Sequence, residues 1–138
     1  MSEDQPLPED LIDLQRARGA ARRALDVHAW EMTLARRAAA AAAGAGVQEQ
    51  PWREEDLARE VELRGVYRTT VAAIAAHPVM VQAAAERRGW AVEEKLRALA
   101  PTPEIVVVLD EELGREVVEV RIAGVAVERN GAPLNPVA

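Results

Sequence analysis

The chain has 138 residues, no cysteine, and 17 basic against 23 acidic side chains, which gives a formal net charge of -6 at pH 7. Without cysteine it can form neither disulfides nor thiolate metal sites, and an acidic balance argues against a protein that coats nucleic acid. The sequence has no apolar run long enough to cross a membrane and no signal peptide at its start, so we expect a cytoplasmic location.

Hydrophobic residues make up 49% of the chain, which suits a single folded domain. Phe is absent and Tyr occurs once, so Ala, Leu and Val must provide most of the packing. We expect Trp30, Trp52 and Trp90 to act as the large packing anchors. Small side chains bury little apolar area each, and oligomerisation is a common remedy for a thin core.

A long helix is predicted over residues 8–43, after a segment 1–7 that we expect to be mobile. Pro8 suits the first helical position, and acidic side chains follow it near the positive end of the helix dipole. Gly19 lies inside this helix, and a kink there is the alternative to a continuous helix. Apolar residues at three- and four-residue spacing form a wide face: Leu11, Leu14, Ala21, Leu25, Met32 and Ala35, with Val27, Trp30 and Leu34 beside them.

A second helix is predicted after a short connector, which makes the two helices an antiparallel pair. Pro51 and the acidic residues 54–56 mark its start, and His77-Pro78 marks its end. A third helix should run from Pro78 to about residue 88 and a fourth over residues 91–100. The alternative is one continuous helix through Gly89. In either case residues 8–100 form a helical body.

Residues 101–138 are expected to form a β-rich tail, because valines alternate there between turn signals. The run 105–109 is continuously apolar, which favours a strand buried on both faces. Residues 116–122 and 125–129 are the next strands, with Gly124 as a bulge or corner. Asn130-Gly131 predicts a type I′ hairpin turn, and residues 134–137 could return as an edge stub. The predicted fold class is α+β and mostly α, in a single domain whose β tail packs on its own helices or on a sister chain.

No residue pattern predicts a catalytic, cofactor or metal site, so we do not expect an enzyme. The only serine is Ser2, and no threonine lies in a nucleophile motif. His28 and His77 lack the spacing that places two metal ligands on one helix face. An enzyme would need an acid/base site built from Asp, Glu, these histidines or Tyr67.

The best candidate for nucleic-acid contact is the segment 81–98. Ala85 and Gly89 followed by a second helix resemble the helix-turn-helix pattern, although acidic side chains open the second helix and Lys95 replaces a buried aliphatic. Its candidate phosphate contacts are Arg87, Arg88, Lys95 and Arg97. The order of helices and β tail also resembles the layout of some phage small terminase subunits. Abundant Ala and Arg fit a GC-rich bacterial or phage origin.

The leading hypothesis is a non-enzymatic assembly or adaptor protein that works as a homo-oligomer through protein–protein contacts, with a small DNA-binding protein of the regulatory or phage-packaging type as the alternative. A wide helical face and an exposed strand edge would bury themselves against a sister chain. The predicted interface residues are Leu11, Leu14, Leu25, Trp30 and Met32 on the first helix, and Val106, Val108, Val118 and Val120 in the tail.

Overall fold

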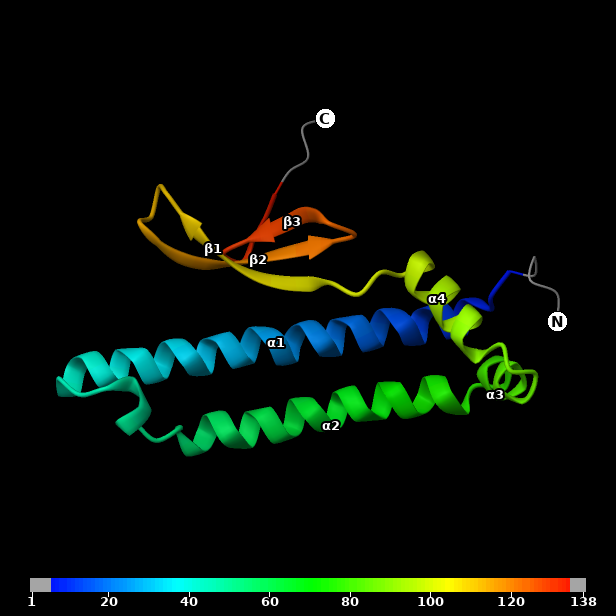
Figure 1. The fold of residues 1–138 in the computed structure, drawn as a ribbon, viewed down its shortest axis with the longest axis horizontal. Helices are drawn as coiled ribbons and strands as arrows, with labels where there is room; N and C mark the ends of the chain where they lie inside the picture. Colours follow the sequence, from blue (N-terminus) through cyan, green and yellow to red (C-terminus); the bar gives the residue numbers. More distant parts are fainter. Residues whose placement is uncertain (1–5, 135–138) are drawn as a thin grey trace.

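The computed structural model describes residues 6–134, and within them a helical hairpin is followed by two short helices and an antiparallel sheet (Figure 1). The sequence-based prediction of a mostly α, α+β fold is confirmed. The elements are α1 Glu9–Ala43, the 3-10 turn η1 Val47–Glu49, α2 Glu54–Ala76, α3 Pro78–Ala85, α4 Gly89–Leu99, β1 Glu104–Asp110, β2 Arg115–Ile122, β3 Val125–Arg129 and β4 Ala132–Pro133.

Helices α1 and α2 form the antiparallel pair, and the sheet lies on the other side of α1 (Figure 1). Gly44 ends α1 in the left-handed conformation, with φ of 63°, and its N–H caps the last turn. A buried histidine ties the two helices together: Nε2 of His28 lies 2.8 Å from the carbonyl oxygen of Asp56, so this nitrogen carries the proton and donates. Met32 and Leu63 are buried in the same pair.

The main hydrophobic core lies at the end of the hairpin where α3 and α4 fold back over α1. Leu7 belongs to this core, so the ordered body begins before Pro8 and the predicted mobile segment cannot extend to Leu7; residues 1–5 lie outside the described residues. The cluster consists of Leu7, Leu11, Ile74, Ala83, Val92 and Leu96.

Two separate helices, and not one continuous helix, occupy the segment after His77. His77 caps α3 because its ring Nδ1 accepts from the N–H of Val79, at 3.1 Å. The break between α3 and α4 is made by Arg87, which takes the left-handed conformation at φ of 59°, whereas Gly89 is already the first residue of α4. The glycine is therefore not the turn residue that its type suggests.

Gly19 does not kink α1, which is continuous. A Cβ atom built on Gly19 would lie 3.1 Å from Cδ of Pro103 and 3.7 Å from Cα of Thr102. The linker between α4 and β1 therefore crosses α1 at this glycine, and the small residue permits the close approach.

A buried polar network joins α1 to the start of this linker. Nε2 of Gln15, which is fully buried, donates to the carbonyl oxygen of Ala100 at 2.9 Å. The guanidinium of Arg18 bonds Oε1 of Gln15 and also pairs with Glu93 of α4. Each polar group of the network has a partner, so burial costs little, and the bonds fix how α4 crosses α1.

The sheet is a meander with strand order β1-β2-β3-β4. Tight turns at Ala123-Gly124 and Asn130-Gly131 close the second and third hairpins, and all four turn residues have positive φ. The Asn130-Gly131 turn carries the signal that the sequence gives for a type I′ hairpin. Gly124 is a turn residue and not a bulge, since the irregularity of the ladder lies at Val120 and Arg121. Of the predicted stub over 134–137, only Leu134 is among the described residues, and its N–H donates to the carbonyl oxygen of Val127 at 2.9 Å.

The tryptophans are not the packing anchors that composition suggests. Trp90 is 77% exposed at the start of α4, and Trp52 is 40% exposed. Arg36 stacks over Trp52 with its guanidinium carbon 4.4 Å from the ring centroid, and Arg37 lies over Trp30 at 5.3 Å. Leu, Ile, Val and Ala fill the core instead, so the prediction of tryptophan anchors is wrong for Trp90 and Trp52.

Candidate interaction surfaces

Strand β1 is an edge strand that exposes apolar side chains. It pairs with β2 over its whole length, and no strand within residues 6–134 pairs with its other side. Val107 is 40% exposed and Leu109 is 67% exposed. The prediction that this run is buried on both faces is therefore wrong, because the sheet covers only one edge of the strand and the helices leave this part of its face open.

The turn between β1 and β2 is a rigid acidic loop with two exposed leucines. Oδ1 of Asp110 accepts from the N–H groups of Glu112 and Leu113, at 2.9 and 3.0 Å. The N–H of Gly114 donates to the carbonyl oxygen of Asp110 at 2.8 Å. These three bonds fix the turn, which we call the hairpin tip (residues 109–113), while Leu109 and Leu113 remain at least half exposed.

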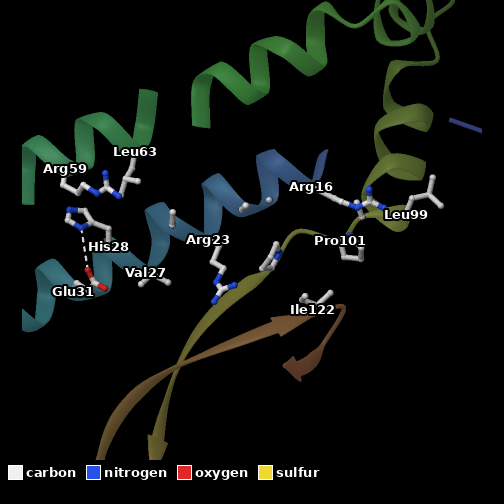
Figure 2. A pocket seen from close by; sticks show the side chains of 15 residues that line it. Arg16, Arg23, Val27, His28, Glu31, Arg59, Leu63, Leu99, Pro101 and Ile122 are labelled. Carbon is white, nitrogen blue, oxygen red and sulfur yellow. Dashed lines mark ion pairs between the residues drawn. The ribbon is translucent and has the colours of Figure 1, made fainter. Parts of the chain in front are cut away.

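An open groove of about 750 Å³ runs along α1 between α2 and the sheet (Figure 2). Small α1 side chains, Ala20, Ala24 and Val27, form its floor. Its walls come from elements that are far apart in sequence: Arg59 and Leu63 of α2, Leu99 and Pro101 after α4, and Ile122 of β2. Figure 2 shows these walls on both sides of α1.

The rim of the groove is predominantly basic. Arg16, Arg23 and Arg59 line it, against one carboxylate, Glu31. Glu31 lies 3.9 Å from Nδ1 of the buried His28, as the dashed line in Figure 2 marks. The volume lies within the range of pockets that take a small ligand or a few side chains. An apolar floor with a basic rim suits an occupant that carries both apolar and acidic groups.

The arginines of the rim already have acidic neighbours. Arg59 lies 3.2 Å from Glu62, both exposed on α2, and Arg23 pairs with Glu128 of β3. Arg16 bonds Asp13 at 2.6 Å. The pairs of Arg59 and Arg16 are exposed and contribute little free energy, so an incoming carboxylate can replace their partners at small cost.

The predicted sister-chain contacts on α1 are distributed between the core and the surface of the single chain. Leu11 and Met32 are buried, and Leu14 packs against the main core. Leu25 and Trp30 are half-buried. Leu11 and Met32 thus have almost no surface left for a sister chain. The structure of one chain does not test the predicted interface, but such an interface can include little of these two residues.

The predicted tail contacts lie on both faces of the sheet. Val118 and Val120 face α1, where they line a narrow groove together with Trp30. The alternation of the strands places Val106 and Val108 on the opposite face. Val120 is buried and the other three are half-buried. Sequence reasoning missed Val107, Leu109 and Leu113; the signal available for them was that the first strand of a meander has only one neighbour.

The candidate nucleic-acid residues lie in and after the turn between α3 and α4. Arg87 is exposed in this turn, and Arg88 is 3.8 Å from Glu86. Arg97 bonds Glu93 at 3.0 Å, which neutralises part of its charge, and Lys95 is half-buried on α4. The turn therefore separates two helices as the resemblance implies, but DNA binding stays a prediction.

The acid/base candidates of the sequence do not meet in one site. His28 lines the groove, but its Nε2 already donates to α2. His77 caps α3 and its Nε2 lies 3.0 Å from Oδ2 of Asp10, and this hydrogen bond lowers the pKa of Asp10 below its usual value. The ring of Tyr67 lies 5.8 Å from the guanidinium of Arg22. Each of these groups has a structural role in joining helices.

Two further carboxylates have displaced pKa values, and one of them, Glu93, joins α4 to α1. Burial raises the pKa of Glu93, but its hydrogen bonds with Arg18 and Arg97 outweigh this and hold the pKa below the usual value. The hydrogen bond from Arg53 lowers the pKa of Asp56 at the start of α2. Within residues 6–134, no group of three or more His, Asp or Glu side chains could hold a metal ion, and no helix is long and apolar enough to cross a membrane.

Comparison of the chain with protein-family models, with curated proteins and with solved structures finds no match.

Proposed function

We propose that this protein is a non-enzymatic assembly module that joins copies of itself through the free edge of β1. The observation that carries the proposal is the unprotected edge of β1. This strand has seven residues, is apolar from Ile105 to Leu109, and contains no proline, lysine or bulge. The free N–H and C=O groups of such an edge pair readily with another strand.

The opposite edge of the same sheet supports this interpretation by contrast. Strand β4 has two residues, one of which is Pro133, and proline cannot donate a main-chain hydrogen bond. Short edge strands and prolines are the usual means by which soluble proteins prevent sheets from joining. This chain protects the β4 edge in that way and leaves the β1 edge, with Val107 and Leu109 exposed, unprotected.

A second copy of the chain is the simplest occupant of the edge. Two β1 strands related by a two-fold axis pair antiparallel and present the same surface to each other. A register centred on Val106 places Glu104 opposite Val108 of the other copy, which keeps the acidic ends Glu104 and Asp110 apart. Val107 and Ile105 then lie opposite each other across the junction, so their exposed apolar surface becomes covered.

Light scattering on Val107→Lys tests the proposal. The unaltered chain should form a dimer or larger oligomer, and Val107→Lys should weaken self-association by at least about tenfold, because a lysine on the edge must be desolvated for the strands to pair. The matched control is Val66→Lys, which places lysine at an exposed valine of α2. A monomeric unaltered chain, or equal effects of both variants, would refute the role of the β1 edge.

A further inference from the structure

We infer that the groove along α1 receives the hairpin tip of a second copy of this chain. The inference rests on the proposed self-association, but it concerns the turn after β1 and not the edge of β1. The groove offers an apolar floor and a rim with three arginines. The tip offers two exposed leucines, Leu109 and Leu113, on either side of three consecutive acidic residues. The two surfaces therefore match in polarity and in charge.

The tip has the properties of a preorganised ligand. Three hydrogen bonds centred on Asp110 hold its backbone, so little conformational entropy remains to be lost when it is buried. The carboxylates of Glu111 and Glu112 are not used in these bonds and can face arginines. Exposed leucines beside acidic residues are the combination that an apolar floor with a basic rim selects.

A chain cannot place the tip in its own groove. The tip is separated by Gly114 alone from Arg115, the first residue of β2, whereas the groove is lined by Ile122, the last residue of the same strand. At about 3.3 Å per residue these two ends are roughly 23 Å apart. Glu116 also lies 3.4 Å from Arg37, beyond the part of α1 that lines the groove. The occupant must therefore come from another molecule.

The contact joins two different surfaces of the same chain. Two copies can exchange their tips reciprocally around a two-fold axis, or each copy can pass its tip to the next in a ring. In both arrangements Arg59 of one chain lies near an acidic side chain of the tip of another. The inference therefore predicts a specific charge pair between chains.

Cross-linking tests the placement directly, because the natural chain has no cysteine. Leu113→Cys in one population and Ala24→Cys in a second are mixed, allowed to exchange subunits, and treated with a short bismaleimide. We expect a covalent heterodimer. The control pairs Leu113→Cys with Ala72→Cys, an exposed alanine of α2 that does not line the groove. Equal yields from both mixtures would overturn the inference.

Charge reversal provides the second test. Arg59→Glu should raise the dissociation constant of self-association about tenfold, and combining it with Glu112→Arg should restore the affinity. The control is Arg64→Glu: both arginines lie on α2, their side chains are equally exposed at 55%, and each pairs with a glutamate of that helix, but Arg64 does not line the groove. Equal effects of both reversals would contradict the inference.

Light scattering on the same samples separates the two proposals. An oligomer without preferential cross-linking and without rescue would refute the groove contact and leave the proposed self-association standing. A monomer at every concentration would refute both.

Discussion

Gly19 shows how one residue fixes the position of a distant segment. Its hydrogen atom faces the ring of Pro103, where the linker to the sheet crosses α1. Glycine inside a helix costs about 1 kcal/mol relative to alanine, and at Gly19 the close approach of the linker offsets this cost. Gly65 in α2 provides the contrast, because a Cβ atom added there would meet nothing within 4 Å.

The two glycines should therefore respond differently to substitution. Gly65→Ala should raise the free energy of unfolding by about 0.5–1 kcal/mol, since only helix propensity changes. Gly19→Val should lower it by about 1–3 kcal/mol, because the side chain must displace Pro103. Urea denaturation measures both. If Gly19→Val and Gly65→Val lowered the free energy of unfolding by the same amount, the close approach of the linker to Gly19 would not contribute to stability.

Glu119 of β2 is the second residue whose role depends on distant partners. It is only 3% exposed, yet it is charged, because Arg129 of β3 and Arg121 of its own strand bond both carboxylate oxygens. The hydrogen bonds from Arg129 and Arg121 lower the pKa of Glu119 below its usual value. A carboxylate with a lowered folded-state pKa stabilises the fold above its unfolded pKa, and this contribution disappears as the pH falls through the folded-state value.

Glu119→Gln should consequently be less stable than the unaltered chain at pH 7, with a difference that shrinks as the pH falls below about 4. Thermal unfolding of both proteins between pH 7 and pH 3 measures this difference. A difference in melting temperature that stays constant between pH 7 and pH 3 would show that the ion pairs of Glu119 do not contribute to the stability of the sheet.

At the scale of elements, local sequence signals predicted whether a segment forms a helix, a strand or a turn better than they predicted how deeply that segment is buried. The helix starts near Pro8 and Pro78 and the Asn130-Gly131 turn follow from backbone preferences that act within a few residues. The run 105–109 was interpreted as a buried strand because it is continuously apolar. Its place at the edge depends on the order of strands in the sheet, which no local pattern contains.

The whole molecule is held together unevenly. The main core lies between α1, α3, α4 and the end of α2, whereas the sheet contacts α1 through a few valines and through ion pairs such as Arg23 with Glu128 and Arg37 with Glu116. Elements with fewer buried apolar contacts open at lower free energy than the core.

Hydrogen exchange should show this difference. In Val107→Lys, chosen so that self-association does not protect the edge, the amides of β1, β2 and β3 should exchange through a smaller opening free energy than those of Leu11 and Leu96. Exchange followed by NMR at several denaturant concentrations measures both. Equal opening free energies would mean that the sheet and helices unfold as one cooperative unit.

The sequence by itself determined the helical body, the change to strands after Pro101, the tight turn at Asn130-Gly131 and the lack of cysteine chemistry, because these depend on composition and on preferences between near neighbours. Only the tertiary structure decided which surfaces are covered. The burial of Gln15 depends on a bond to Ala100, 85 residues away, and the exposure of Leu109 depends on the lack of a covering element among the described residues. Burial is a property of what lies across from a side chain, and the chain brings those partners together only when it folds.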